Sequence, residues 1–184
     1  QTVEGFRSTL DKVVDINPDR LAVFNYAHVP WMKKNQLLIK EEALPNLETR
    51  MALQQLIMEK LTAAGYVYIG MDHYAKPDDE IVQAQKNKTL YRNFQGYTTH
   101  KNSDLYAFGA SSISQTDEVF VQNHKDIKRY QALVTEGHLP VERGLRVTAE
   151  DKLRRDAITR IMCDLELDKS AFGAQWNIDF DAYF

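Results

Sequence analysis

The side chains in this sequence that could do chemistry gather in four short stretches, residues 25–28, 72–73, 92–97 and 109–114. Imidazole and carboxylate groups suit divalent metals, so a metal-dependent hydrolase site is one hypothesis. Its candidate ligands are His28, Asp72, His73 and His100. Because these four lack the spacing of common metal-binding motifs, one ordinary hydrogen bond for each histidine is the favoured interpretation.

Two other groups could supply a nucleophile. Ser111, Ser112 and Ser114 lie in a small-residue stretch without the G-x-S-x-G frame of a serine nucleophile. This favours a turn or ligand contact over covalent catalysis. The single cysteine, Cys163, falls on the apolar side of a predicted helix, and we expect a buried, inert thiol. The sequence contains no phosphate-binding glycine motif.

Two stretches carry basic residues in suggestive settings. The run Tyr91-Arg92-Asn93-Phe94 could clamp a base or a carboxylate, and core aromatics beneath a loop explain its spacing equally well. A later predicted helix carries four basic residues: Lys152, Arg154, Arg155 and Arg160. Since the net charge is −3, a solvated helix face is favoured over a nucleic-acid contact.

The elements that would position these residues begin with a helix over residues 3–14, with Thr2 as a possible N-cap. The apolar run 21–27 predicts a strand buried on both faces, as in a parallel sheet. A helix between Asn46 and Gly65 and a strand over 66–71 follow, so residues 21–71 are expected to form one βαβ unit. The polar ends of these strands are where α/β sheets bind ligands.

The second half begins with a short helix over residues 77–85, followed by residues 89–99, which lack a helical period. Residues 104–114 predict a strand ending in a small-residue turn, and 122–136 a helix. A capping box at Thr148–Asp151 precedes a helical stripe made of Leu153, Ala157, Ile158, Ile161, Met162 and Leu165. With a further helical piece at 172–176, the last 40 residues are expected to be all helical.

Composition limits the class of protein. The 184 residues are 43% hydrophobic and 27% charged, as in a soluble globular protein. One cysteine excludes an internal disulfide framework and any zinc or iron–sulfur site built from several thiolates of this chain. No apolar run approaches the ~20 residues of a membrane span, which predicts a cytoplasmic protein. The chain begins at Gln1 and stops at Phe184 without a turn or polar tail, and we expect a fragment.

Five stretches in order resemble one enzyme family. They are Asn17–Leu21 leading into Val23–His28, Tyr66–His73, Arg92–Thr99, Gly109–Ser114 and Arg154–Asp156. The chain in these places is similar to the bacterial oxygen-independent coproporphyrinogen III oxidases (dehydrogenases), radical S-adenosylmethionine enzymes of haem synthesis. The resemblance implies an α/β fold, the last strands of a partial (β/α) barrel followed by an all-helical segment. Residues 1–144 would be the C-terminal part of the barrel, and residues 145–184 the beginning of a truncated helical domain.

The resemblance also implies an activity for the whole enzyme. A reduced [4Fe–4S] cluster, held by a cysteine loop upstream of this chain, cleaves S-adenosylmethionine to a 5′-deoxyadenosyl radical. The radical removes hydrogen from two propionates of coproporphyrinogen III in turn, and loss of carbon dioxide and an electron gives protoporphyrinogen IX. Two S-adenosylmethionine molecules bind the parent, which is expected to be a monomer with an unidentified electron donor and without nucleic-acid or membrane partners. The fragment alone is expected to be inactive.

By the same resemblance, four residues belong to the active site. Phe94 and Gln95 would lie beside the cofactors and tetrapyrrole, Ala27 would line the second S-adenosylmethionine site through its backbone, and Ile113 would pack on the adenine of the first. Charge alone suggests Arg92 as a propionate partner, and no residue of this chain is expected to bind a metal. The alternatives are a haem-handling relative on the same scaffold, a non-enzymatic ligand-binding domain and the metal-dependent hydrolase.

Overall fold

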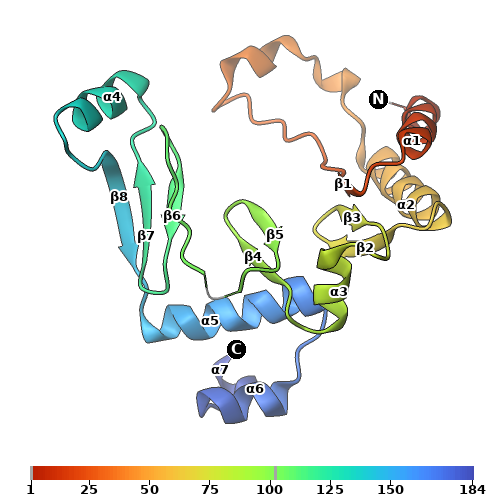
Figure 1. Cartoon of the computed structure of the whole chain (residues 1–184). Helices are drawn as coiled ribbons and strands as arrows, with labels where there is room; N and C mark the ends of the chain where they lie inside the picture. Colours follow the sequence, from red (N-terminus) through yellow and green to blue (C-terminus); the bar gives the residue numbers. More distant parts are fainter. Residues whose placement is uncertain (1, 102) are drawn as a thin grey trace. The chain divides into compact units, whose positions relative to one another are not determined.

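The structure, a computed structural model, describes residues 2–101 and 103–184, and the chain divides into two compact units, Gln1–Gln83 and Ala84–Phe184 (Figure 1). The boundary expected at residues 144/145 concerns the domains of a longer parent and stays a prediction.

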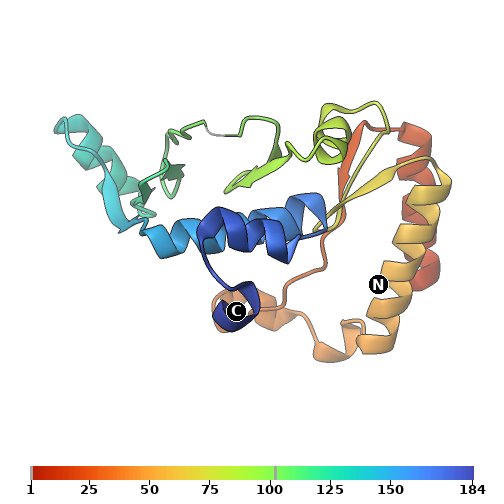
Figure 2. The same ribbon diagram turned by 90° about the horizontal axis from the view of Figure 1, so that it is seen from below.

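Two capped helices form one layer of the first unit. Helix α1 (Val3–Ile16) begins where the Thr2 hydroxyl accepts a hydrogen bond from the Gly5 N–H at 3.1 Å, so the predicted cap is confirmed. Helix α2 (Leu47–Ala63) begins at the predicted Asn46 cap, whose side chain accepts from the Thr49 N–H. The helices lie side by side, as Figures 1 and 2 both show. Their shared core includes Leu10, Leu56, Ile57, Leu61, Tyr66 and Tyr74.

The sheet of the first unit corrects the expected βαβ unit. Strands β1 (Arg20–Ala22) and β2 (Val67–Gly70) both pair antiparallel with β3 (His73–Ala75), in the order β1-β3-β2. The outer strands therefore run in the same direction with α2 between them in sequence, but β3 separates them. Met71 and Asp72, at φ +43° and +63°, form the two-residue turn from β2 into β3. The polar end of β2 is thus a hairpin turn.

The apolar run 21–27 is also less buried than predicted. Only its first two residues belong to β1, and the chain then continues as a loop in which Phe24 is 67% and Tyr26 51% exposed. An apolar run shows a preference for burial but not which partner provides it. After two short 3₁₀ turns, η1 (Lys34–Leu38) and η2 (Glu41–Ala43), the chain enters α2. Helix α3 (Glu80–Lys86) matches the predicted short helix.

The second unit starts with strands that sequence periodicity missed. Residues 89–99 contain a hairpin of β4 (Tyr91–Asn93) and β5 (Gly96–Thr98). A three-stranded antiparallel sheet of β6 (Ile113–Gln115), β7 (Val119–Asn123) and β8 (Val141–Arg146) follows. Helix α4 (Ile127–Thr135) connects β7 to β8. The helix expected over 122–136 is therefore wrong at its start, because 119–123 is paired on both edges as strand β7.

From Ala149 onward the chain is helical, so the all-helical segment expected for the last 40 residues is wrong only at its start, where Leu145 and Arg146 end β8. Helix α5 (Ala149–Thr159) begins at a capping box in which Thr148 and Asp151 bond reciprocally, and it continues into η3 (Arg160–Asp164), a π-helical segment. Helices α6 (Lys169–Trp176) and α7 (Phe180–Tyr183) follow. Leu153, Ala157 and Phe172 form a small core. Of the predicted helical stripe, Ile158, Ile161 and Leu165 are instead more than half exposed.

The mixed α/β class is thus confirmed. In detail, the strands in the part of the chain that the structure describes pair antiparallel. None of the described helices is both long and apolar enough to cross a membrane.

Candidate functional site

Phe94 and Gln95 are the two residues at the tip of the β4–β5 hairpin. The strands pair Asn93 with Gly96, which leaves only these two residues in the loop. The Gln95 N–H donates to the Asn93 side chain at 2.8 Å, and Gly96 turns the chain at φ +133°. Phe94 is 57% exposed and lies edge-on to Phe120 of β7, with ring centroids 5.3 Å apart. The hairpin therefore presents both predicted residues at an exposed, fixed turn.

An open pocket of about 650 Å³ lies in the same unit. Strand β4, the sheet and helix α5 line it with Tyr91, Arg92, Asn93, Phe94, Gln115, Phe120, Val147, Asp151, Arg154, Arg155, Ile158, Thr159 and Met162. Apolar side chains mixed with a few polar groups are typical of small-ligand sites, and the volume falls in their range. Of the four site residues implied by the resemblance, Phe94 lines this pocket; Gln95 and Ile113 do not.

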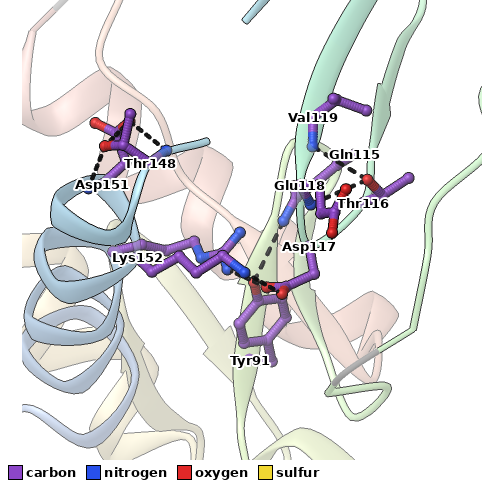
Figure 3. Close-up of polar contacts among 10 residues, drawn as sticks. Tyr91, Gln115, Thr116, Asp117, Glu118, Val119, Thr148, Asp151 and Lys152 are labelled. Carbon is purple, nitrogen blue, oxygen red and sulfur yellow. Dashed lines mark hydrogen bonds and ion pairs between the residues drawn. The ribbon is translucent and has the colours of Figure 1, made fainter. Parts of the chain in front are cut away.

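A carboxylate at the β6–β7 turn ties the sheet to α5 (Figure 3). Asp117 forms ion pairs with Lys152 and, at 2.6 Å, with Arg155. Hydrogen bonds from Lys152 and then Arg155 lower the pKa of the Asp117 carboxyl below its usual value. A lowered pKa gives stability that is present above about pH 4 and is lost as the pH falls through the folded-state value. Asp117 is 68% exposed, so its contribution is small.

The same turn is built by Thr116, whose hydroxyl accepts from the Glu118 and Val119 N–H groups (Figure 3). Before it, Gln115 is buried, and its amide donates to the Tyr91 hydroxyl at 3.2 Å. This bond joins β6 to β4 beside the pocket. Sequence reasoning missed both Gln115 and Asp117. The one available signal was the turn-forming run Gln-Thr-Asp-Glu at residues 115–118. Such a run indicates a turn but not which other segment the turn contacts.

Ile113 begins β6 directly after a tight turn at Gly109–Ser112. The Ser112 hydroxyl donates to the Gly109 carbonyl at 2.7 Å, and the Asn123 amide donates to the same carbonyl at 3.0 Å. The Ser114 hydroxyl accepts from the Ala107 N–H. Ser111 has φ +64° and donates its N–H to the His124 carbonyl. The serines therefore build a turn, which confirms the interpretation favoured over a nucleophile cluster.

The basic residues of α5 are held by neighbouring carboxylates. In addition to the Asp117 pairs, Arg154 bonds Glu150 at 2.8 Å and Arg160 bonds Asp156 at 3.2 Å. Arg92 differs from them. Its guanidinium lies over the Tyr97 ring at 5.9 Å, and within residues 2–101 and 103–184 it forms no ion pair or hydrogen bond.

The π-helical segment holds Cys163. A π-turn frees carbonyl groups from the helix, and here the Tyr97 hydroxyl donates to the Met162 carbonyl at 2.8 Å while the Gln85 amide donates to the Cys163 carbonyl at 2.9 Å. The Cys163 side chain is fully buried. Burial raises the pKa of its thiol to about 11, from an ordinary value of 9.0. The predicted burial of the thiol is confirmed, and its inertness stays a prediction.

Cys163 should therefore resist alkylation while the chain is folded. A pKa higher by about two units reduces the thiolate fraction roughly 100-fold at pH 8. The folded chain should react with iodoacetamide at least about 100-fold more slowly than the same chain in urea. Because the folded-state pKa is raised, the associated stability is complete below pH 9.0 and is lost as the pH rises toward about 11. Equal alkylation rates in the two states would contradict this environment.

In the first unit, Ala27 lies on the exposed loop that follows β1. The Gln36 amide holds this loop by donating to the Ala27 carbonyl at 3.1 Å while its oxygen accepts from the Val29 N–H at 2.6 Å. Sequence reasoning gave no role to Gln36. Ala27 belongs to the first unit, whereas Phe94, Gln95 and Ile113 belong to the second.

The proposed metal ligands are not gathered. Among the residues that the structure describes, no three histidine, cysteine, aspartate or glutamate side chains are placed to share a metal ion. His73 bonds the Met71 carbonyl through Nδ1 at 2.7 Å, which is the ordinary contact favoured for a strand-end histidine.

Comparison with solved structures finds an enzyme part of which shares the fold of this chain. The whole chain superposes on 42% of the coproporphyrinogen III oxidase from Escherichia coli, described as a radical SAM enzyme, with a TM-score of 0.92 and 43% identity. The chain has the fold of part of a radical SAM enzyme. A comparison with models of protein families finds no match.

Relatives found by sequence similarity agree with the structural comparison. The chain is similar over its full length to oxygen-independent coproporphyrinogen III oxidases from Synechocystis (44% identity), Thermostichus vulcanus (47%) and Helicobacter pylori (45%). It spans 40%, 57% and 40% of their respective lengths. The resemblance to the oxygen-independent coproporphyrinogen III oxidases is therefore confirmed over the entire chain, which corresponds to a part of these longer enzymes.

Proposed function

We propose that this chain is part of an enzyme that oxidatively decarboxylates two propionates of coproporphyrinogen III to vinyl groups, giving protoporphyrinogen IX in haem synthesis. One observation carries the proposal: the similarity to enzymes of this name extends over all 184 residues at 43–47% identity. The whole enzyme would be a cytoplasmic monomer supplied with electrons by a donor that the sequence does not identify.

Gln95 and Phe94 would contact the bound reactants. The Gln95 side chain is exposed and makes no hydrogen bond within the described part of the chain, so its amide is available to a ligand. Its backbone is held by Asn93, which keeps the tip of the hairpin in one conformation. Phe94 packs one edge on Phe120 and leaves over half of its surface for an apolar partner.

This chain would contact S-adenosylmethionine but would not bind the iron–sulfur cluster. This chain cannot hold an iron–sulfur cluster through several thiolates, because Cys163 is the single cysteine, is buried and has a thiol pKa of about 11. We therefore place the [4Fe–4S] cluster on other residues of a longer protein. S-adenosylmethionine bound with that cluster supplies the radical chemistry of the enzyme. Here, half-buried Ile113 would pack on the adenine of one S-adenosylmethionine, and the Ala27 backbone would line the site of a second.

The test has two arms. In a longer protein with a reconstituted cluster, assayed without oxygen, Gln95→Ala and Phe94→Ala should each lower kcat/KM for coproporphyrinogen III at least about 10-fold, a loss of about 1.4 kcal/mol. Gln131→Ala on α4 and Phe108→Ala, which change exposed residues of the same types, should not. The 184-residue chain treated with iron and sulfide should remain colourless and form no 5′-deoxyadenosine.

Two results would overturn the proposal. The first is an absence of protoporphyrinogen IX from the longer wild-type protein. The second, which concerns the site alone, is normal turnover by both hairpin variants.

A further inference from the structure

The pocket of the second unit has three arginines on its walls, and two of them are already neutralised. Arg154 is paired with Glu150 at 2.8 Å and Arg155 with Asp117 at 2.6 Å. The one acid on the walls, Asp151, is occupied by the capping box, where it accepts from the Thr148 N–H at 2.9 Å and from its hydroxyl at 2.7 Å.

Arg92 is the cation left without a partner. Over the ranges that the structure describes, its guanidinium donates no hydrogen bond and meets no carboxylate. Its contact with the Tyr97 ring, at 5.9 Å, supports the guanidinium and leaves its N–H groups available. Such a planar group is suited to binding a carboxylate through two parallel hydrogen bonds.

The remaining walls are mainly apolar. Phe94 and Phe120 form an edge-to-face pair at 5.3 Å, and Val147, Ile158 and Met162 also line the pocket. Ile158 and Phe94 are 60% and 57% exposed, so this apolar surface is accessible. A free guanidinium beside such walls matches a ligand with a large apolar body and an acidic side chain.

We propose that this pocket binds an edge of a carboxylate-bearing tetrapyrrole, with Arg92 bound to one propionate carboxylate and Phe94 and Phe120 packed on the ring system. The choice of a tetrapyrrole rests on the proposed function. The carboxylate specificity rests on the unpaired Arg92. The resulting contact fixes one acidic side chain of the ligand at a known place beside the hairpin tip that carries Gln95.

The test uses the 184-residue chain and coproporphyrin III, an air-stable and fluorescent tetrapyrrole with four propionates. Arg92→Gln should raise its Kd about 10-fold, because it removes a hydrogen-bonded charge pair that is partly exposed. Arg92→Lys, which keeps the charge but not the planar fork, should raise it less. Arg143→Gln is the matched control, since Arg143 is an exposed arginine of β8 that bonds Gln122 and does not line the pocket.

Raising the salt concentration should weaken the binding of coproporphyrin III to the wild type more than to Arg92→Gln. Salt screens the pair between Arg92 and the ligand carboxylate, which the variant lacks. Inorganic phosphate at millimolar concentration should not displace coproporphyrin III. If it does, the pocket is a general anion site and the tetrapyrrole assignment is wrong. Circular dichroism verifies that each variant is folded.

The proposal fails if coproporphyrin III does not bind saturably, or if Arg92→Gln and Arg143→Gln bind equally well. A separate assay distinguishes this failure from that of the proposed function. In a longer, active protein, Arg92→Gln should raise KM for coproporphyrinogen III about 10-fold. If the wild type turns over and the variant has an unchanged KM, the Arg92 proposal is wrong and the proposed function stands. Arg92-dependent binding by a wild-type protein without turnover sinks the proposed reaction alone.

Discussion

Phe172→Ala should lower the free energy of unfolding of the Ala84–Phe184 unit by about 3–5 kcal/mol, the usual cost of removing a buried phenyl ring. Phe172 is fully buried at the centre of the helical core. Its ring contacts Trp176, Phe180 and Phe184, with centroids 5.6–6.3 Å away, and the Arg160 guanidinium lies over it at 5.4 Å. Little can collapse into the space, because Gly173 next to it already lies against the Ile178 carbonyl.

Urea unfolding followed by tryptophan fluorescence measures this loss. A background of Trp31→Phe leaves Trp176 as the reporter, since the chain has two tryptophans and Trp31 is 77% exposed in the other unit. Phe108→Ala is the matched control, because Phe108 is 91% exposed and its removal should change stability by less than about 0.5 kcal/mol. Equal midpoints for the two variants would show that Phe172 is not a core residue.

Asp156→Ala should be the second most damaging substitution, at about 2–3 kcal/mol. The Asp156 carboxylate accepts from Arg160 at 3.2 Å, from the Gln175 amide at 3.1 Å and from the Trp176 indole N–H at 2.8 Å. It therefore joins α5 and η3 to α6. Its removal leaves the partly buried indole N–H without its acceptor, which costs more than the bond itself contributes, while the Arg160 guanidinium keeps its bond to the Gln175 oxygen at 2.6 Å.

The same unfolding experiment, with Trp176 as reporter, measures the effect. Asp181→Ala is the control: among the described residues this carboxylate pairs with Lys169 alone, it is 74% exposed, and it should contribute less than about 1 kcal/mol. A shift of the Trp176 emission in the folded Asp156→Ala variant would support the lost bond directly. An unchanged spectrum and an unchanged midpoint would contradict it.

The sequence predicted best what is encoded within a few residues. The caps at Thr2 and Asn46 and the box at Thr148–Asp151 form as expected, because each depends on a side chain and an N–H three residues away. The helix expected between Asn46 and Gly65 also forms, as α2.

Pairing between strands was predicted poorly. The apolar run 21–27 contains no information about β3, whose residues lie 51 to 55 positions after their partners in β1 and which separates β1 from β2. The short strands β4 and β5 have three residues each, too few for a period to be recognised. The candidate site was also predicted only in part. The resemblance named Phe94 and Gln95, but Gln115, which bonds Tyr91 of that hairpin, and Asp117, which pairs with α5, become apparent only from contacts distant in sequence.

The loop of the β4–β5 hairpin has only two residues, so its length cannot change without altering the hairpin. Adding one residue between Phe94 and Gln95 would either enlarge the loop or slip β5 by one position against β4, and a slip sends every side chain of the strand to the opposite side. Tyr97, now across from Arg92, would then turn away from the guanidinium and from the Met162 carbonyl together. Substitutions at this tip should therefore be tolerated far better than insertions or deletions in any natural or engineered variant.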